Sequence, residues 1–75
     1  MIKFKVGEYY TPATSPSISA LKCIKTTKCF VWFYDEEKEN EIKVKKNEGV
    51  HFNGNDLEKW EQVEAYGYLI RAIDN

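Results

Sequence analysis

The sequence predicts a mainly β fold, a small five-stranded barrel or half-barrel with one short helix before the last strand. Several short segments alternate apolar and charged residues with the period of two that marks a strand with one solvated face. Residues typical of turns separate these segments at short intervals, as in antiparallel hairpins. The chain of 75 residues is long enough to enclose a modest core. We therefore expect residues 1–75 to form a single domain.

The first predicted strand covers residues 2–10. Its apolar residues alternate with lysines and are Ile2, Phe4 and Val6. Gly7 interrupts the pattern, and a glycine within a strand commonly marks a bend. Residues 11–17 contain both prolines of the chain together with serine and threonine, which predicts a loop.

Residues 18–26 and 29–34 are predicted to form the central hairpin. The second strand, CFVWFY, is apolar on both faces, which an ordinary half-solvated sheet does not explain. A three-residue turn aligns one face with Leu21 and Cys23 in the core, and this face consists of Cys29, Val31 and Phe33. The other face points outward with Ile24 and consists of Phe30, Trp32 and Tyr34.

The length of the turn decides how the two cysteines are related. The three-residue turn at 26–28 leaves Cys23 and Cys29 as diagonal neighbours about 7 to 8 Å apart, which is too far for an easy disulfide. A two-residue turn would place the thiols on opposite faces, and a turn from Lys25 to Thr27 would set them directly opposite each other. We expect free thiols, as is usual in the cytoplasm.

The outward stripe of Phe30, Trp32 and Tyr34 needs either a cover or a partner. Full burial of one such side chain stabilises a protein by about 1.5 to 3 kcal/mol, while the total stability of a small domain is on the order of 5 kcal/mol. If all three side chains were exposed to solvent, much of that stability would be lost. Burial of the stripe by another part of the chain is therefore favoured. The candidates are the curvature of the barrel and the segment that carries Leu57 and Trp60. Without a cover, the stripe is a binding surface.

The second half of the chain begins with residues 35–40, DEEKEN, which contain no apolar side chain and are expected to form a solvated hairpin loop. Residues 41–46 alternate apolar side chains with lysines, which predicts a strand with a lysine-bearing outer face. We expect a short extended piece at 50–52 and the last strand at 66–73.

Residues 55–66 carry conflicting signals. The Asn53-Gly54 pair is a strong signal for a two-residue hairpin turn, and such a turn would pair Val50 with Leu57. Against it, an N-cap residue at Asn55 or Asp56 and a helical spacing of apolar residues favour a short helix. The residues with that spacing are Leu57, Trp60 and Val63. We predict the helix, because strong strand formers are sparse in this segment.

Three short patterns run along the chain. A VG pair is followed by an aromatic residue, a hairpin reads T-x-x-F-V, and a tyrosine-rich last strand closes with RA. The residues are Val6, Gly7 and Tyr9, then Thr27, Phe30 and Val31, and finally Tyr66, Tyr68, Arg71 and Ala72. In these patterns the chain resembles a set of small bacterial and phage-encoded proteins of unassigned function, although Thr26 stands where those proteins often have arginine. The resemblance implies a compact SH3-like β-barrel and a mobile-element origin, and it carries over no functional residue.

The formal net charge of −1 gives no general attraction to nucleic acid or to an anionic membrane. The charges are unevenly spread, with +4 on residues 1–34 and −4 on each of the segments 35–41 and 47–75. Such a two-toned surface can orient a partner. No apolar run approaches the roughly 20 residues that span a bilayer, so we expect a cytoplasmic protein that does not enter a membrane.

Few side chains are suited to metal binding or catalysis. The only soft metal ligands are Cys23, Cys29 and His51. A catalytic dyad would likewise need one of these cysteines as nucleophile beside His51 as base. The spacing of the three residues does not match zinc-binding pairs, and such a dyad would need a third group to orient the histidine. The glycines are too dispersed for a phosphate-binding loop. We therefore predict no catalytic residue, no metal and no cofactor, and we expect that the protein is not an enzyme.

Binding is the remaining hypothesis. Aromatic side chains rimmed by charge are typical of protein-binding hot spots, and the near-neutral net charge favours a protein partner, which for a phage-like protein is a host protein that it binds or inhibits. The alternative is single-stranded nucleic acid, stacked on the aromatic stripe beside lysines. The candidate partner-binding residues are Phe30, Trp32, Tyr34, Lys22, Lys43 and Lys45. The simpler role of the lysines is to keep an outer strand face soluble, and we expect a monomer or a weak homodimer.

Overall fold

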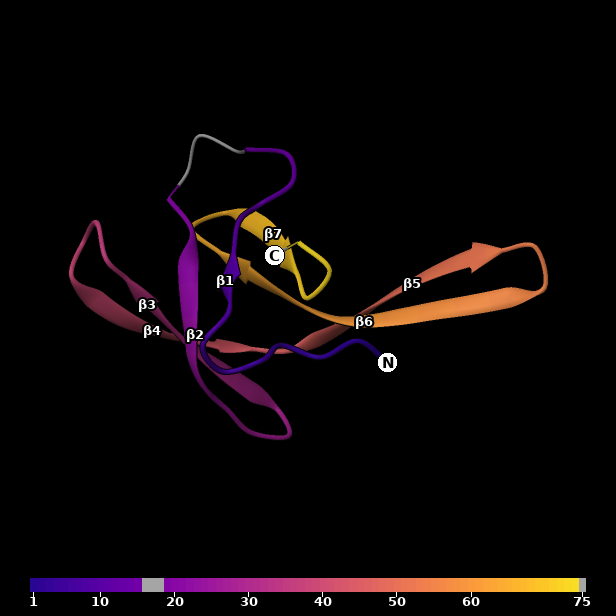
Figure 1. Ribbon diagram of the computed structural model, residues 1–75, viewed down its shortest axis with the longest axis horizontal. Coiled ribbons are helices and arrows are strands. Elements are labelled where there is room, and N and C mark those ends of the chain that lie inside the picture. Colours follow the sequence, from indigo (N-terminus) through magenta and orange to yellow (C-terminus); the bar gives the residue numbers. More distant parts are fainter. Residues whose placement is uncertain (16–18, 75) are drawn as a thin grey trace.

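Seven strands in two antiparallel sheets make up the fold, and the computed structural model describes residues 1–15 and 19–74 (Figure 1). The first sheet has the order β1-β2-β3-β4 and consists of β1 (Tyr9–Tyr10), β2 (Leu21–Thr26), β3 (Phe30–Asp35) and β4 (Asn40–Lys45). The second has the order β5-β6-β7 and consists of β5 (Asn47–Asn53), β6 (Asp56–Ala65) and β7 (Tyr68–Arg71). The prediction of a mainly β fold is confirmed. The predicted loop at 11–17 and strand at 18–26 each extend into residues 16–18, which lie outside the described residues.

The core is built from the inward-facing side chains of both sheets. The first sheet and the segment before it contribute Phe4, Tyr10, Leu21, Cys23, Val31 and Phe33, and the second sheet and the segment after it contribute Trp60, Val63, Ala65, Ile70 and Ala72. The rings of Phe4, Tyr10 and Phe33 meet edge to face, with centroids 4.8 to 6.2 Å apart, a favourable arrangement of aromatic side chains. Four of the predicted core residues, Leu21, Cys23, Val31 and Phe33, are therefore correctly placed.

The two sheets do not close into a barrel, and no helix occurs within residues 1–15 and 19–74. The helix predicted over residues 55–66 is wrong, because β6 occupies most of this segment. β6 pairs with β5 on one side and with β7 on the other, and these two sets of cross-strand partners outweigh the modest helix preference of its Leu, Glu and Lys residues. The SH3-like assignment stays a prediction.

The turn between β5 and β6 consists of Gly54 and Asn55. Gly54 has a φ of +67°, and a glycine at the first position of a two-residue hairpin turn is typical of type II′. The hairpin signal in the sequence was thus correct in kind but displaced by one residue. As a result Leu57 lies opposite Phe52 and not opposite Val50.

The turn between β2 and β3 differs from the predicted three-residue turn. Thr26 pairs with Val31, and within the connection the Thr27 N–H donates to the Phe30 carbonyl at 2.8 Å. A β-bulge between Cys23 and Lys25 then shifts the register, so that Cys23 faces Phe33 on the core side. Cys29 lies in the connection and is exposed, so its assignment to the core was wrong.

The N-terminal strand is much shorter than predicted. Only Tyr9–Tyr10 forms a strand, while Ile2 makes a single parallel bridge to Trp60. Phe4 is buried, but Ile2 and Val6 are 44% and 61% exposed. Of the three alternating apolar residues, only Phe4 therefore belongs to the core. Gly7 has a φ of +95° and forms the bend that its position predicts.

Beyond the core, the β5–β6 hairpin continues as a two-stranded ribbon, here called the arm and defined as residues 48–59 (Figure 1). The molecule measures 43 × 27 × 20 Å along its principal axes. At the base of the arm, the Trp60 indole lies over Gly49, where it leaves no room for a Cβ atom. The indole N–H also donates to the Gln62 side chain at 3.1 Å. Every residue of the arm except Gly49 is exposed.

Candidate functional site

The side of the first sheet that points away from the core carries aromatic and lysine side chains in alternating rows. Directly paired residues share a face of a sheet, and the register places Trp32 between Lys25 and Lys43. Tyr34 lies between Lys22 and Glu41 in the next row. We call this surface the outer face, and it consists of Tyr9, Lys22, Lys25, Phe30, Trp32, Tyr34, Glu41, Lys43 and Lys45.

Lysine side chains cover two of the three rings in the aromatic stripe of the outer face, those of Phe30 and Trp32. The Lys25 ammonium lies 4.7 Å from the centroid of the Trp32 ring, and the Lys43 ammonium lies 4.3 Å from the Phe30 ring and 5.4 Å from the Trp32 ring. These distances are within the range of cation–π interactions. Phe30, Trp32 and Tyr34 are each half-buried. The stripe is therefore partly covered, by neighbours on its own sheet.

The predicted cover of the stripe by Leu57 and Trp60 is wrong. Leu57 lies on the arm and is 47% exposed, whereas Trp60 is buried in the core. The predicted helix would have carried both side chains on one face, but in β6 an odd spacing of three residues sends them to opposite sides of the strand. All six predicted partner-binding residues nevertheless lie together on the outer face.

The outer face is positively charged. It carries four lysines against the single carboxylate of Glu41, which gives a net charge of +3. At its margin, the Tyr9 hydroxyl donates to Glu36 at 2.9 Å, and this hydrogen bond raises the pKa of the tyrosine. The concentration of positive charge on one face of a nearly neutral chain is the main electrostatic feature of the first sheet.

The acidic segment 35–40 is only partly the solvated loop that its composition predicts, since Asp35 is the last residue of β3. Asp35 is buried, and its carboxylate accepts hydrogen bonds from the N–H groups of Glu37 and Lys38 at 3.0 and 3.1 Å. It also accepts one from the Tyr66 hydroxyl at 3.1 Å, which connects the first sheet to the turn before β7. An aspartate that closes a turn in this way is a common structural element, so we assign Asp35 a structural role.

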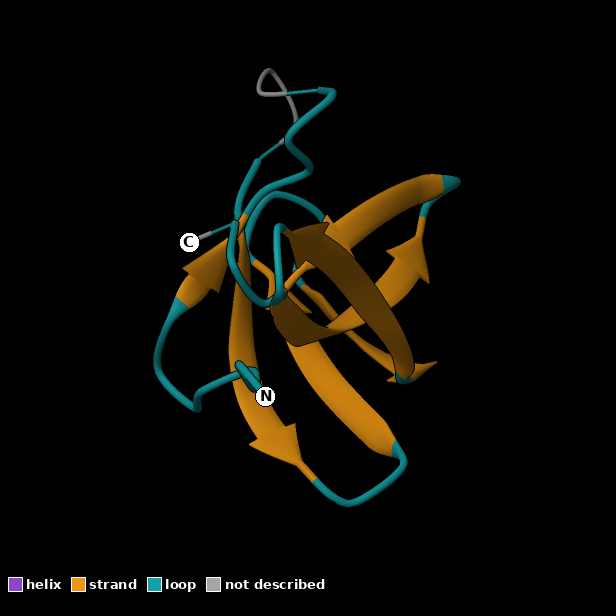
Figure 2. Ribbon diagram, turned by 90° about the vertical axis from the view of Figure 1, so that its right-hand side faces the viewer, coloured by secondary structure: helices purple, strands orange, loops and turns teal. Residues whose placement is uncertain are grey.

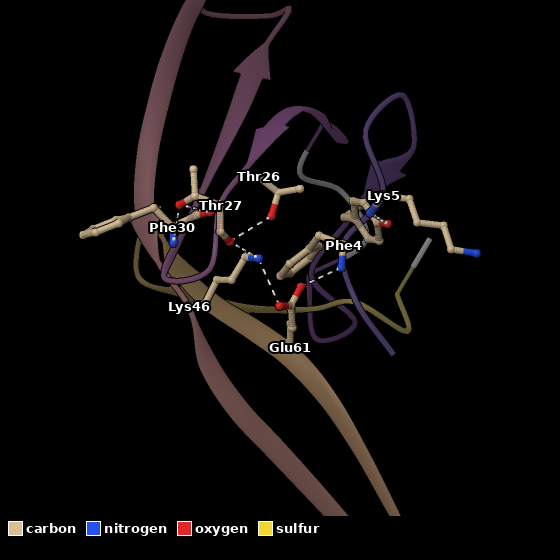
Figure 3. Close-up of polar contacts among 8 residues, drawn as sticks. Phe4, Lys5, Thr26, Thr27, Phe30, Lys46 and Glu61 are labelled. Carbon is tan, nitrogen blue, oxygen red and sulfur yellow. Dashed lines mark hydrogen bonds and ion pairs between the residues drawn. The ribbon is translucent and has the colours of Figure 1, made fainter. Parts of the chain in front are cut away.

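A hollow of about 620 Å³ lies where the N-terminal segment, the β2–β3 turn and the two sheets meet. Its wall includes Lys46 and Glu61, whose ammonium and carboxylate groups lie 3.0 Å apart and are each 9% exposed. The Lys46 ammonium also donates to the Thr27 carbonyl at 2.7 Å, and Glu61 accepts from the Phe4 N–H at 2.9 Å (Figure 3). Through these contacts the ion pair ties four chain segments together, so we assign it a structural role.

The three side chains considered for chemistry do not converge. Cys23 is buried in the core, Cys29 is exposed in the β2–β3 connection, and His51 is exposed on the arm. Burial raises the pKa of the Cys23 thiol, which makes it a poor nucleophile at neutral pH. Over the described ranges 1–15 and 19–74, no cluster of three or more potential metal ligands occurs. The same part of the chain holds no helix able to span a membrane.

No protein-family model, no curated protein and no solved structure matches this chain. The resemblance to small phage-encoded proteins accordingly stays a prediction, and the outer face has to be interpreted from its own residues.

Sequence reasoning missed two features of this surface. Lys25 joins the outer face only because the bulge after Cys23 shifts the register, and nothing in the local sequence marks that bulge. The arm was missed because the spacing of apolar residues over 55–66 predicts a helix. The Asn53-Gly54 pair was the signal that could have found it.

Proposed function

We propose that this protein is a non-enzymatic interaction module whose outer face binds an acidic surface of a protein partner. The single observation that carries the proposal is the position of Trp32 between two lysines, each with its ammonium group over the ring. A carboxylate of a partner can pair with such an ammonium group while apolar atoms contact the edge of the indole. Tryptophan and tyrosine in this kind of setting are enriched in binding hot spots.

Electrostatics supports the same partner. A face with a net charge of +3 attracts acidic surfaces and accelerates the encounter with them. If the chain comes from a mobile element, as its resemblance implies, the acidic partner is a host protein in the cytoplasm. The proposal also gives a reason for the aromatic residues on this face, since lysines would be enough to keep it solvated.

Single-stranded nucleic acid is the second candidate, favoured by the alternation of lysines with aromatic rings. Base stacking, however, needs an open ring face. Lys25 and Lys43 lie over the Trp32 ring, so a base has to displace one of them before it can stack. The geometry therefore supports an acidic protein surface better than a stacked strand.

The test is a fluorescence-anisotropy titration of two labelled probes, a peptide of alternating glutamate and leucine and an oligothymidylate. We expect the peptide to bind at low salt and the Lys43→Glu variant to bind it about tenfold more weakly, which corresponds to about 1.4 kcal/mol. The matched control is Lys59→Glu, which makes the same charge change on the exposed arm and should leave peptide affinity within about twofold of the wild type.

Two results would contradict the proposal. The first is equal loss of peptide affinity in Lys43→Glu and Lys59→Glu, which would indicate attraction to net charge only. The second is tighter binding of oligothymidylate than of the peptide, with quenching of tryptophan fluorescence that disappears in Trp32→Ala. That second result would assign the outer face to single-stranded nucleic acid.

A further inference from the structure

The outer face has an order along β3 that its net charge alone does not describe. Phe30, Trp32 and Tyr34 follow one another on this strand and form the aromatic stripe. A border of lysines flanks the stripe on each side, and the four residues are Lys22 and Lys25 on β2 and Lys43 and Lys45 on β4. The only carboxylate, that of Glu41, lies beside Tyr34 at one end of the β4 border. The face is thus an apolar track between two basic borders.

The outer face is accessible to a partner. The side chains of Lys25, Lys43 and Lys45 are exposed. The arm extends to one end of the long axis, away from β3 and β4 at the other end (Figure 1). In the view along this axis the arm lies in front of the remaining strands (Figure 2). The arm therefore does not lie over the aromatic stripe.

The position of β3 within its sheet restricts the kind of chain that can lie along the stripe. β3 has a hydrogen-bonded neighbour on each side, so its backbone offers no row of free groups to an added strand. A strand laid on the side chains of the face would leave its own N–H and C=O groups without partners. A helix pairs these groups internally and can pack on a face of side chains without losing hydrogen bonds.

We propose that the outer face binds an amphipathic helix of the protein partner, which lies along β3 with its apolar stripe on the aromatic rings and carboxylates on both flanks. Side chains two residues apart on a strand are separated by about 6.8 Å. The ring centroids of Phe30 and Trp32 are 6.4 Å apart. Residues four apart on a helix are separated by about 6 Å along its axis, so successive turns of the helix meet successive rings.

The width and the charge of the face fit the same occupant. β2 and β4 are separated by about 10 Å, twice the spacing of adjacent strands, and a helix with its side chains is about 10 Å wide. Carboxylates on both flanks of the helix then lie within reach of both lysine borders, which is a complementary arrangement of charge. This inference rests on the proposed function, because it names the kind of acidic surface that the same face binds.

The test compares two labelled peptides of about 15 residues, near the shortest length at which a helix forms in water. Both have leucine at every fourth position and the same number of glutamates. In the flanked peptide the glutamates lie on both sides of the leucine stripe, and in the matched control peptide they lie on the opposite side of the helix. Circular dichroism establishes that the two peptides have equal helix content. We expect fluorescence anisotropy to show at least about tenfold tighter binding of the flanked peptide.

Two protein variants test whether the helix contacts both borders. Lys25→Glu and Lys43→Glu each replace one exposed lysine, on opposite sides of Trp32, and each should weaken binding of the flanked peptide about tenfold. Lys59→Glu on the arm is the control and should stay within about twofold of the wild type. Thermal unfolding establishes that each variant is folded. A loss in only one of the two border variants would overturn the inference, and so would equal affinity for the two helical peptides.

The alternating peptide of glutamate and leucine separates failure of this inference from failure of the proposed function. If the alternating peptide binds as tightly as the flanked helix, the helical partner is rejected and an acidic protein surface stands. If none of the acidic peptides binds, the proposed function fails as well. Tightest binding of the flanked helix, with losses in both border variants, supports the inference.

Discussion

The outer face and the arm both present aromatic side chains on β-strands, but they differ in how those side chains are covered. Trp32 lies on β3, which has a neighbouring strand on each side, and it receives one lysine from each. Phe52 lies on β5, which has only β6 beside it, and remains 73% exposed. An aromatic residue in the middle of a sheet is thus partly covered by its own neighbours, whereas one on a two-stranded ribbon stays exposed.

The largest expected effect comes from the ion pair where these two regions join. Lys46 lies between β4 and β5, and Lys46→Met would leave the buried carboxylate of Glu61 without its ammonium partner. We expect a loss of about 3 to 5 kcal/mol in the free energy of unfolding, because an unpaired buried charge is strongly destabilising. Urea unfolding monitored by tryptophan fluorescence measures this loss.

Two further variants show whether the effect arises from the pair. Lys46→Met/Glu61→Gln removes both charges but keeps an acceptor for the Phe4 N–H, so it should recover most of the stability. Lys45→Met changes the exposed neighbour on the outer face and should stay within about 0.5 kcal/mol of the wild type. If the double variant is as unstable as the single one, the loss comes from packing and not from the unpaired charge.

A smaller effect compares the two regions directly. Trp32 is largely covered but not fully buried, so Trp32→Ala should lower the free energy of unfolding by about 1 to 2 kcal/mol, somewhat less than full burial of such a side chain contributes. Phe52→Ser removes a side chain that is 73% exposed and should change stability by less than about 0.5 kcal/mol in dilute monomer. Equal losses in urea unfolding would show that the outer face and the arm are covered to the same extent.

The difference between the two regions also explains what the sequence could predict. The pattern CFVWFY identified the central strand and both of its faces, because Val31 and Phe33 on one side and Trp32 on the other follow the alternation of a strand. The assignment of Cys29 to the core failed because it depended on the turn, whose length is set by local hydrogen bonds and a bulge that periodicity does not report.

The arm could not be predicted by the rule that apolar residues are buried. Leu57, Trp60 and Val63 have the spacing of a helix, yet in the structure Leu57 is exposed while Trp60 and Val63 are buried. The long strand β6 runs from the exposed arm into the core, so some of its apolar residues are exposed and others are buried. Placing the six candidate binding residues on one face did not need this knowledge, because all of them lie on the first sheet and none on the arm.

The smallest expected effect is a dependence on alkaline pH that arises on the inner side of the first sheet, where Cys23 is buried. Burial raises the pKa of this thiol, so the folded chain holds the proton more tightly than the unfolded chain. The stability from this group is complete below the ordinary thiol pKa of 9.0 and is lost as the pH rises through the folded-state pKa. The arm, which is exposed apart from Gly49, contributes no buried titratable group.

Urea unfolding in steps between about pH 8 and about pH 9.5 covers the start of this range, where the ordinary tyrosine pKa of about 10 leaves most tyrosines protonated. We expect the free energy of unfolding of the wild type to fall over this interval and the fall to be reduced in Cys23→Val. Cys29→Val replaces the exposed cysteine and is the matched control, expected to keep the slope of the wild type. An unchanged slope in Cys23→Val would mean that the alkaline loss has another source, and Tyr10, whose pKa is also raised by burial, is then the group to replace.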